Sequence, residues 1–441
     1  MTSLTANEPG LRVPLYPLLY PVIFMAVFAG FQGGRYFLAN RLQELGIACA
    51  LLLFVVGAWQ AVVRLSYREW KDWVLMPSVL IGSIMGISSV VFVLNYQGNA
   101  LYSFFSAREF MLAFMGPGIY LLVRTGLPIS GVERTIWFAF FALMVNYLAF
   151  YSTMDLREAF FSSDHTISNL VTYDEWRGFR LKPPLFAIMI VLLGSLAMLM
   201  QRRGKTVMLG AMVTIGLAAT IWNIVLFRAT LATMILAVLL YPVLMSHKNR
   251  LKLVIVGAPL ALIVLPVAVT YMVDSFLTAE GGAIRAKAFA RAIEHIAMHP
   301  ILGAGEDSAY GQNYQDIVAK YFFPSDIGLA GVTYKYGFVG VTLYLYMHCK
   351  IWLCLWKSNI LVRETDGRVN PMIWGMLIFI TAQSFNLMLN PGLAYAQGIT
   401  AGSLALALGS LHLVRCQAPM MARGYDRLEN PRILQEKPQS A

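Results

Sequence analysis

Two arginines have positions in the chain that suit anion binding at a membrane surface. Arg228 lies where two apolar runs meet with almost no loop, and Arg285 lies in a polar segment further along, with Lys287 and Arg291 close by. A guanidinium offers a phosphate two parallel, charge-assisted hydrogen bonds, so these residues predict a phosphate or pyrophosphate site. The alternatives are an Arg228 that only snorkels to the interface and a solvated helix around Arg285.

A second basic segment precedes another apolar run. It contains Arg177, Arg180 and Lys182, and we expect it on the outer side of the membrane, where Lys and Arg are usually depleted. Arg177 and Arg180 are therefore further candidate substrate ligands. The alternative is that they anchor the chain at the interface beside Trp176.

Asp326 is the first candidate for a general base. A carboxylate at a membrane edge needs a partner or a role, and this one could accept a proton from a sugar hydroxyl. The alternative is that Asp326 caps the helix that starts there. Glu306 and Asp307 are the rival acids, and His295 and His299 are the rival bases, although a histidine beside proline is more often structural.

Several motifs that would indicate other chemistry are missing from the sequence. There is no Ser-His-Asp order, P-loop, GxGxxG or DxD motif, and the four cysteines have no CxxC spacing. We therefore expect no metal and no cofactor. A group transfer would need a donor that carries its own leaving group, such as a lipid pyrophosphate neutralised by arginines.

The composition predicts the kind of protein that must position these residues. Of 441 residues, 58% are hydrophobic and 13% are charged, whereas about a quarter of a soluble domain is charged. Apolar runs of membrane-spanning length recur, and the mean hydropathy is +0.63. These features exclude an ordinary soluble enzyme. The formal charge of +11 comes from Lys and Arg in loops, so no nucleic-acid partner is expected.

The apolar runs predict an all-α, polytopic membrane protein with about twelve transmembrane helices. Helices are favoured because lipid leaves no backbone group unpaired and the alternation of a barrel is missing. Most Lys and Arg lie in the segments on one side, which places both chain ends in the cytoplasm. The predicted spans are 15–34, 44–63, 73–95, 109–123, 135–152, 184–200, 206–227, 229–246, 253–273, 327–349, 371–389 and 393–413.

The chain is expected to form one transmembrane domain, residues 1–413. Its two larger periplasmic loops would lie at about 153–183 and about 274–326. A polar, basic cytoplasmic tail over 414–441 is expected to be disordered.

The second long loop carries a structured pattern. Residues 283–298 have apolar residues at helical spacing, and the residue before Pro300 avoids the helical region, so the helix should end there. A glycine turn at 301–305 follows. Tyr310 and Tyr314 come next in an aromatic stretch, and their rings could stack on sugars.

Two short motifs in this region resemble a known family. Residues 299–305 read HPILGAG, and residues 336–340, on the next predicted span, read YGFVG. Together with twelve spans, a large outer loop before the tenth span and an arginine at the start of the eighth, they resemble the superfamily of O-antigen ligases and Wzy-type polysaccharide polymerases.

The resemblance implies a metal-independent glycosyltransferase of the GT-C type. Its donor would be a glycan on undecaprenyl pyrophosphate, at the periplasmic face of a bacterial inner membrane. The paired arginines of the family map onto Arg228 and Arg285 as pyrophosphate ligands, and its histidine base maps onto Asp326. The implied reaction is an inverting transfer to a hydroxyl of another lipid-linked unit, with Asp326, or else Glu306, taking the proton.

The aspartate favours the polymerase branch, because ligases that move O-antigen to lipid A core usually keep the histidine. The ligase remains the alternative enzyme, and a lipid-linked oligosaccharide flippase is the alternative outside enzymes. Nearly charge-free span interiors count against a flippase. The expected partners are a lipid-linked donor and acceptor, membrane lipid, and a chain-length regulator and flippase of the same pathway.

Overall fold

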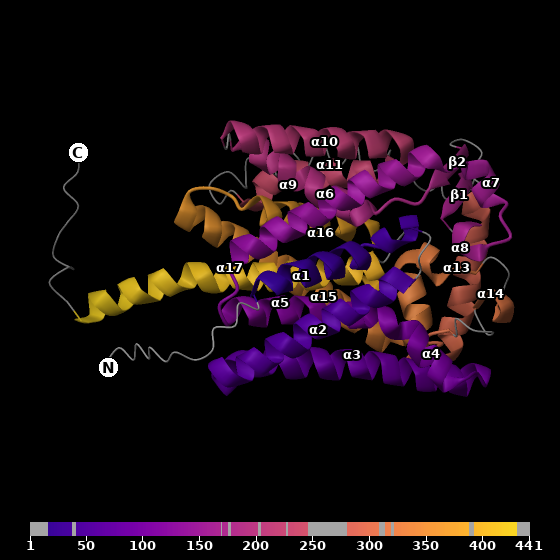
Figure 1. The fold of residues 1–441 in the computed structure, drawn as a ribbon. Coiled ribbons are helices and arrows are strands. Elements are labelled where there is room, and N and C mark those ends of the chain that lie inside the picture. Colours follow the sequence, from indigo (N-terminus) through magenta and orange to yellow (C-terminus); the bar gives the residue numbers. More distant parts are fainter. Residues whose placement is uncertain are drawn as a thin grey trace.

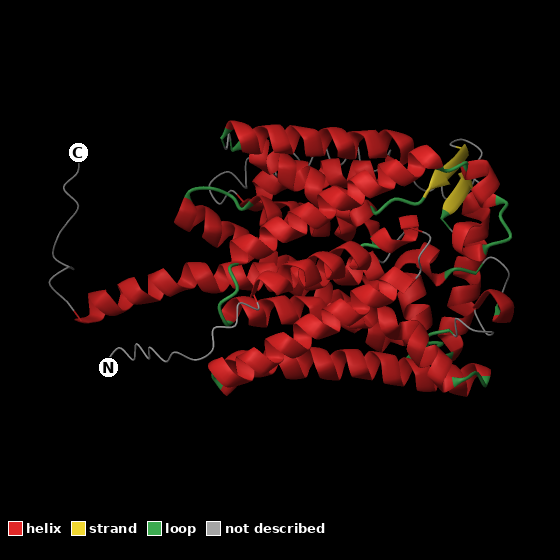
Figure 2. Cartoon of the chain, viewed as in Figure 1, coloured by secondary structure: helices red, strands yellow, loops and turns green. Residues whose placement is uncertain are grey.

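The computed structural model is almost entirely helical (Figure 2). It describes residues 16–37, 41–168, 170–174, 178–201, 204–225, 228–245, 280–307, 314–318, 322–387 and 392–429.

Helices and one hairpin make up this part of the chain. The α-helices are α1 (Tyr16–Gly30), α2 (Arg41–Arg64), α3 (Tyr67–Tyr96), α4 (Ala100–Ser106), α5 (Met115–Arg124), α6 (Ile129–Thr153), α7 (Leu156–Phe160), α8 (His165–Ser168), α9 (Leu185–Met200), α10 (Lys205–Val225), α11 (Arg228–Met245), α13 (Glu280–Met298), α14 (Tyr314–Ile317), α15 (Gly328–Asp366), α16 (Pro371–Asn386) and α17 (Ala396–Glu429). The 3-10 helices are η1 (Gly33–Phe37), η2 (Ala107–Phe114), η3 (Pro324–Ile327) and η4 (Gly392–Ala394). Strands β1 (Val171–Asp174) and β2 (Gly178–Leu181) pair antiparallel, with Val171 opposite Leu181.

Within the described residues, six helical segments are long and apolar enough to cross a membrane. They coincide with six of the predicted spans, so the prediction of a helical, multi-pass membrane protein is confirmed at this level. The six segments are Leu42–Arg64, Tyr67–Tyr96, Ile129–Thr153, Lys205–Val225, Pro324–Asp366 and Ala396–Gln417.

The other predicted spans have different outcomes. Three coincide with shorter apolar helices, at Pro17–Gly30, Leu185–Met200 and Thr230–Tyr241. The predicted span 109–123 is not one helix, because its first residues form η2 and the rest form α5. The predicted span 253–273 lies outside the described residues.

Helix α16 lies at the centre of the core. Most of its 16 residues are buried, and it packs against α9, α11 and α15. The Asn370 side chain caps its start, accepting from the backbone N–H groups of Met372 and Ile373, and Pro371 occupies its first turn. At about 1.5 Å per residue this helix is about 24 Å long. It is short for a span, and protein rather than lipid surrounds most of it.

The two long outer loops of the sequence lie at the same end of the bundle (Figure 1). The first loop forms α7, α8 and the β1–β2 hairpin, and the second forms α13 and α14. We call this end the loop end. The common location agrees with the prediction that both loops lie on one side of the membrane.

Two further expectations concern element boundaries. Helix α13 ends at Met298, directly before His299 and Pro300, so the predicted helix over 283–298 and its proline-directed end are confirmed. Helix α17 continues past residue 414 to Glu429, so the first part of the predicted tail is helical.

Candidate functional site

The candidate site is built around a break in helix α15. Gly337 has φ +64° and ψ −168° inside this helix, a conformation that only glycine adopts readily. A break of this kind leaves backbone groups without their partners one turn away. In a membrane-spanning helix such groups must be satisfied by other parts of the protein.

The glycine turn of the HPILGAG motif supplies the missing partners. In an unbroken helix the N–H groups of Phe338 and Val339 would donate to the carbonyls of Tyr334 and Lys335. Here the turn accepts hydrogen bonds from these two N–H groups and donates hydrogen bonds to these two carbonyls. The bonds are Phe338 N to Pro300 O (2.8 Å), Val339 N to Ile301 O (3.3 Å), Ala304 N to Tyr334 O (2.7 Å) and Gly305 N to Lys335 O (2.8 Å). The two motifs found in the sequence are therefore in direct backbone contact.

Glycines allow the turn to fit between α3 and α15. Gly303 and Gly305 have φ of +72° and +87°. A Cβ on Gly305 would collide with the backbone of Ser88 and Phe92 on α3, and a Cβ on Gly303 would collide with the backbone of Tyr334 on α15. The turn is thus held tightly, and the residue that follows it has a fixed position.

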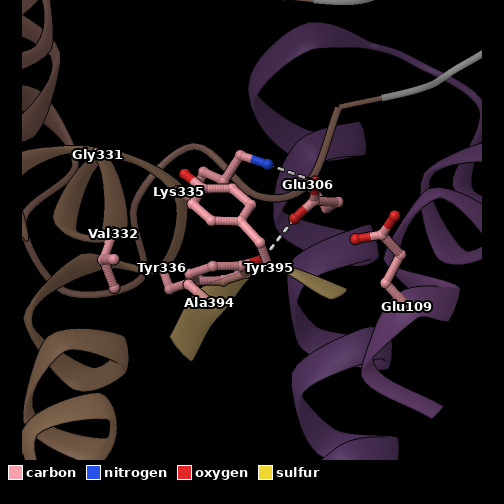
Figure 3. A pocket seen from close by; sticks show the side chains of 8 residues that line it. All are labelled: Glu109, Glu306, Gly331, Val332, Lys335, Tyr336, Ala394 and Tyr395. Carbon is pink, nitrogen blue, oxygen red and sulfur yellow. Dashed lines mark hydrogen bonds and ion pairs between the residues drawn. The ribbon is translucent and has the colours of Figure 1, made fainter. Parts of the chain in front are cut away.

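That residue is Glu306, which is buried (Figure 3). Lys335 Nζ lies 2.5 Å from its Oε1, and the Tyr336 hydroxyl donates to its Oε2. Ser103 Oγ on α4 donates to the Glu306 carbonyl at 2.5 Å. A buried carboxylate needs such pairing, because an unpaired charge is costly away from water.

Asp307 adds a second carboxylate beside Lys335. Its Oδ1 lies 4.0 Å from Lys335 Nζ, and its Oδ2 accepts a hydrogen bond from the Tyr314 backbone N–H at 3.2 Å. Burial raises the pKa of Asp307, and the Lys335 charge opposes that rise. Tyr314 is itself buried and donates its hydroxyl to Gly305 O, so its ring packs within the protein.

A pocket of about 80 Å³ opens beside these residues. Glu109 from η2 and Glu306 contribute carboxylates to it, and Tyr336 and Tyr395 contribute rings (Figure 3). Glu109 is held in place because its Oε1 accepts from Gln43 Nε2 at 2.7 Å and its Oε2 accepts from the Ala396 N–H at 3.2 Å. Residues from four distant parts of the chain thus meet at one small polar space.

Charged groups of both signs surround the pocket. Glu109 interacts electrostatically with Arg35 of η1, and both Arg35 and Asp326 interact with Lys182. Burial lowers the pKa of Lys182, and the Arg35 charge lowers it further. Burial also raises the pKa of Tyr395, which Asp326 faces. Asp326 therefore interacts electrostatically with both a lysine and a tyrosine.

Asp326 itself is exposed, and lies in η3 at the entry to α15. Its Oδ1 accepts a hydrogen bond from Ser325 Oγ at 3.3 Å. The alternative that Asp326 caps the helix is not borne out, because Ile327 is at the N-cap of α15 and makes no side-chain cap bond.

Two of the candidate phosphate ligands, Arg285 and Arg291, lie on helix α13. Arg285 and Arg291 of α13 are exposed, and Arg291 Nη1 pairs with Glu294 at 3.0 Å. Arg228 is the first residue of α11, and its side chain lies outside what the structure describes. Whether the Arg228 and Arg285 side chains converge stays a prediction.

Among the other candidate substrate ligands, some lie in the described part of the chain and some do not. Arg180 of β2 is buried, and its Nη1 donates to the Val225 carbonyl at 3.3 Å, which ties the hairpin to the end of α10. Arg177 and Tyr310 lie outside the described residues.

Of the two histidines near the end of α13, His295 lies beside Tyr96 and Tyr334. His299 is exposed, and its ring centroid is 4.9 Å from that of His295. His295 Nε2 is 3.4 Å from the Tyr96 hydroxyl. Burial, together with the His299 charge, lowers the pKa of His295 to about 4, so its ring is neutral at physiological pH.

Sequence analysis missed Lys335, Glu109 and Tyr395. A charged residue inside an apolar run is a signal that could have found Lys335, which directly precedes the YGFVG motif. No sequence pattern joins Glu109 or Tyr395 to it. Among the described residues, no group of three or more His, Cys, Asp or Glu side chains has an arrangement that could hold a metal ion.

Comparison with known proteins adds no family. No protein-family model matches the chain, and no curated protein is similar to it in sequence. The fold therefore defines the class of protein on its own, a helical membrane protein with a polar site at its loop end.

Proposed function

We propose that this protein is a membrane glycosyltransferase that polymerises lipid-linked oligosaccharide repeat units. The substrates would be glycans on undecaprenyl pyrophosphate, joined at the periplasmic face of a bacterial inner membrane into exopolysaccharide or O-antigen. The complete topology of this proposal has about twelve spans, one of them over 253–273, with both termini cytoplasmic. A chain-length regulator and a flippase would act in the same pathway.

One observation carries the proposal. The two motifs that resemble the polymerase and ligase superfamily, residues 299–305 and 336–340, exchange two backbone hydrogen bonds, and the first motif makes two more to Tyr334 and Lys335, directly before the second. Two motifs that were linked only by resemblance to one family are therefore in contact at the candidate site. That site lies at the end of the bundle where both long loops gather, which is where a membrane enzyme would meet a sugar (Figure 1).

The proposed chemistry needs a leaving group, a nucleophile and a proton acceptor. The acceptor hydroxyl forms a bond to the anomeric carbon of the donor while the bond from that carbon to the pyrophosphate oxygen breaks. The hydroxyl proton passes to a carboxylate, and the pyrophosphate leaves with the electron pair. Arg228 and Arg285 would stabilise its charge through charge-assisted hydrogen bonds.

The contacts favour Asp326 over Glu306 as the proton acceptor. Glu306 already accepts a hydrogen bond on each of its oxygens, from Lys335 and from Tyr336. Asp326 is exposed, so an incoming hydroxyl can reach its carboxylate. Glu306 then holds Lys335 and Tyr336 in position beside the pocket.

The experiment measures glycan length in a strain that lacks the gene. It is complemented with the wild type, Asp326→Ala, Arg228→Ala or Arg285→Ala, and lipid-linked single units are resolved from polymer on a gel. Lys287→Ala is the matched control for Arg285→Ala, since both side chains are exposed on α13. Single units without polymer in the null strain and in the three variants, with polymer restored by Lys287→Ala, are expected.

Two other outcomes would replace the proposal. Polymer that forms on the lipid carrier but never reaches lipid A in the null strain would make the protein a ligase. Single units that stay at the cytoplasmic face would make it a flippase. Immunoblots of membrane fractions check that each variant is present in equal amount.

A further inference from the structure

A long apolar groove leads away from the polar pocket. It has a volume of about 600 Å³ and is lined mainly by α3, α15 and α17, with contributions from η2 and α5. Three residues, Val332, Tyr336 and Ala394, line both the pocket and the groove. The apolar space and the candidate site are therefore continuous.

Most of the residues that line the groove are apolar. Tyr336 lies at the end that meets the pocket, whereas Asp72, Lys350 and Ser410 line the far part. Along α3 the lining extends from Asp72 to Ser88, a rise of about 24 Å at 1.5 Å per residue. This length is most of the roughly 30 Å hydrocarbon core of a bilayer.

The dimensions of the groove suit a single flexible chain. With a volume of about 600 Å³ along about 24 Å, the groove has room for an extended hydrocarbon chain.

The wall made by α3 fits this use. Helix α3 packs against α2, α4, α5 and η2, and the groove separates it from α15 and α17 over much of its length. It lies at the outer edge of the bundle in Figure 1. A chain could thus enter from the surrounding lipid without crossing the protein core.

We propose that this groove holds the lipid chain of the lipid-linked glycan substrate and directs its polar end to the Glu306 pocket. The choice of this occupant rests on the function proposed above. It is favoured over a bilayer phospholipid because the groove ends at the candidate site, through the shared residues Val332, Tyr336 and Ala394. Apolar burial along the groove would contribute affinity for the lipid chain.

The test uses photocrosslinking of the full-length protein in its own membranes. A photoreactive phenylalanine analogue replaces Ser83, which lines the groove, or Val79, which lies one turn away on α3, is exposed and does not line it. Cells are labelled with a radioactive isoprenoid precursor or a radioactive fatty acid. We expect isoprenoid label on the Ser83 protein, several-fold above that on the Val79 protein.

A filling substitution gives the second readout. Ser83→Trp should lower the yield of polymer per amount of protein several-fold, whereas Val79→Trp should leave it unchanged. Equal fatty-acid label at both positions with no isoprenoid label at Ser83 overturns the inference, and so does a crosslink to another protein.

Failure of the inference and failure of the proposed function are distinguishable. If the null strain loses polymer but Ser83 captures no isoprenoid, the groove assignment is wrong and the function stands. If Ser83 captures isoprenoid but the null strain still makes polymer, the groove binds a polyprenyl lipid and the proposed function is wrong.

Discussion

Two polar clusters lie towards opposite ends of the bundle, and they use their charges differently. The loop-end cluster consists of Glu109, Glu306, Asp307, Lys335 and Tyr336 around the pocket. The inner cluster joins α6, α16 and α17 near the connection between α15 and α16, at the end away from the loops (Figure 1).

The side chains of the inner cluster form hydrogen bonds with one another. Its members are Glu133, Asn370 and His412, and Glu133 Oε1 accepts from Asn370 Nδ2 at 2.9 Å and lies 2.8 Å from His412 Nε2. The other amide atom of Asn370 caps α16. Each side chain thus connects helices, and together they fix the start of α16 against its neighbours.

The loop-end cluster contains more charged groups than a link between helices needs. Lys335 pairs with Glu306, but Asp307 and Glu109 add two carboxylates nearby, and burial raises the pKa of Asp307. A fold that needed only a link between helices could use the inner arrangement. Excess charge with a perturbed pKa beside a cavity is typical of functional sites. This difference is what we expect if the inner cluster maintains the fold and the loop-end cluster serves the proposed chemistry.

The largest expected effect comes from Gly337→Ala, which attacks the support of the loop-end cluster. Its Cβ would overlap the backbone of Ile301 and Leu302 in a conformation that is already unfavourable for alanine. We expect a loss of about 4 kcal/mol or more of folding stability, at the severe end for single substitutions. Denaturation in mixed micelles measures the stability, and the glycan gel measures the polymer.

Gly367→Ala is the matched control for that substitution. Gly367 has the same φ of +64°, but a Cβ there meets nothing within 4 Å. Only the conformational cost of about 1 to 2 kcal/mol is expected. Equal losses for the two variants would mean that contact between turn and helix contributes nothing.

A smaller loss is expected for Lys335→Met, which removes the cation of the loop-end cluster. Glu306 would keep a buried charge without its main partner, at a cost of about 3 kcal/mol. The double variant with Glu306→Gln should recover most of the stability, because neither charge then remains. If the double variant regains stability but not polymer, the pair serves function. If it regains both, the loop-end cluster is as structural as the inner one.

The sequence predicts those parts of the fold that depend on local pattern. Residues 283–298 form a helix that ends before Pro300, because helical periodicity and the restriction before proline act within a few residues. Six long apolar segments are helices for the same reason. Residues 109–123 differ, since Gly116 and Gly118 lie against the backbones of Ser403 and Leu53. Hydropathy carries no information about such close packing, nor about the change from η2 to α5 at residue 115.

The candidate site is predictable only in part for the same physical reason. Glu306 was identifiable because it follows a glycine turn within one motif. Glu109 and Tyr395 meet it through contacts between α4, η2, α15 and the start of α17, far apart in the sequence. Apolar periodicity predicts which residues lie in helices, but not which helices are neighbours. Spacing along one chain therefore could not place these residues together.

Asn370→Ala tests the inner cluster and should have a moderate effect. It removes the cap of α16 and one partner of Glu133, which should cost about 1 to 2 kcal/mol. If the cluster only maintains the fold, polymer per amount of folded protein stays at the wild-type level. Thermal unfolding in detergent and the glycan gel measure the two quantities. Loss of polymer without loss of stability would remove the contrast between the clusters.

The smallest expected effect is a pH dependence at the edge of the loop-end cluster. Burial holds the pKa of His295 at about 4 in the folded protein, below the value of about 6.5 for an unfolded histidine. Between these values the unfolded state binds more protons, so stability rises with pH from about 4 to about 6.5 and is constant above.

His295→Gln should weaken that dependence, because glutamine does not titrate and can still bond to the Tyr96 hydroxyl, which lies 3.4 Å from the His295 ring. The measurement is the unfolding temperature of both proteins between pH 4 and pH 8, where the two curves should separate only on the acid side. His299→Gln is the comparison variant, since the His299 ring is exposed and contacts His295. Removal of the His299 ring should raise the pKa of His295 towards its value in the unfolded chain. Acid should then destabilise the protein less than it destabilises the wild type, but the effect should not disappear. Parallel curves for wild type and His295→Gln would mean that acid acts on the loop end through another group, such as Asp307, whose pKa is raised by burial.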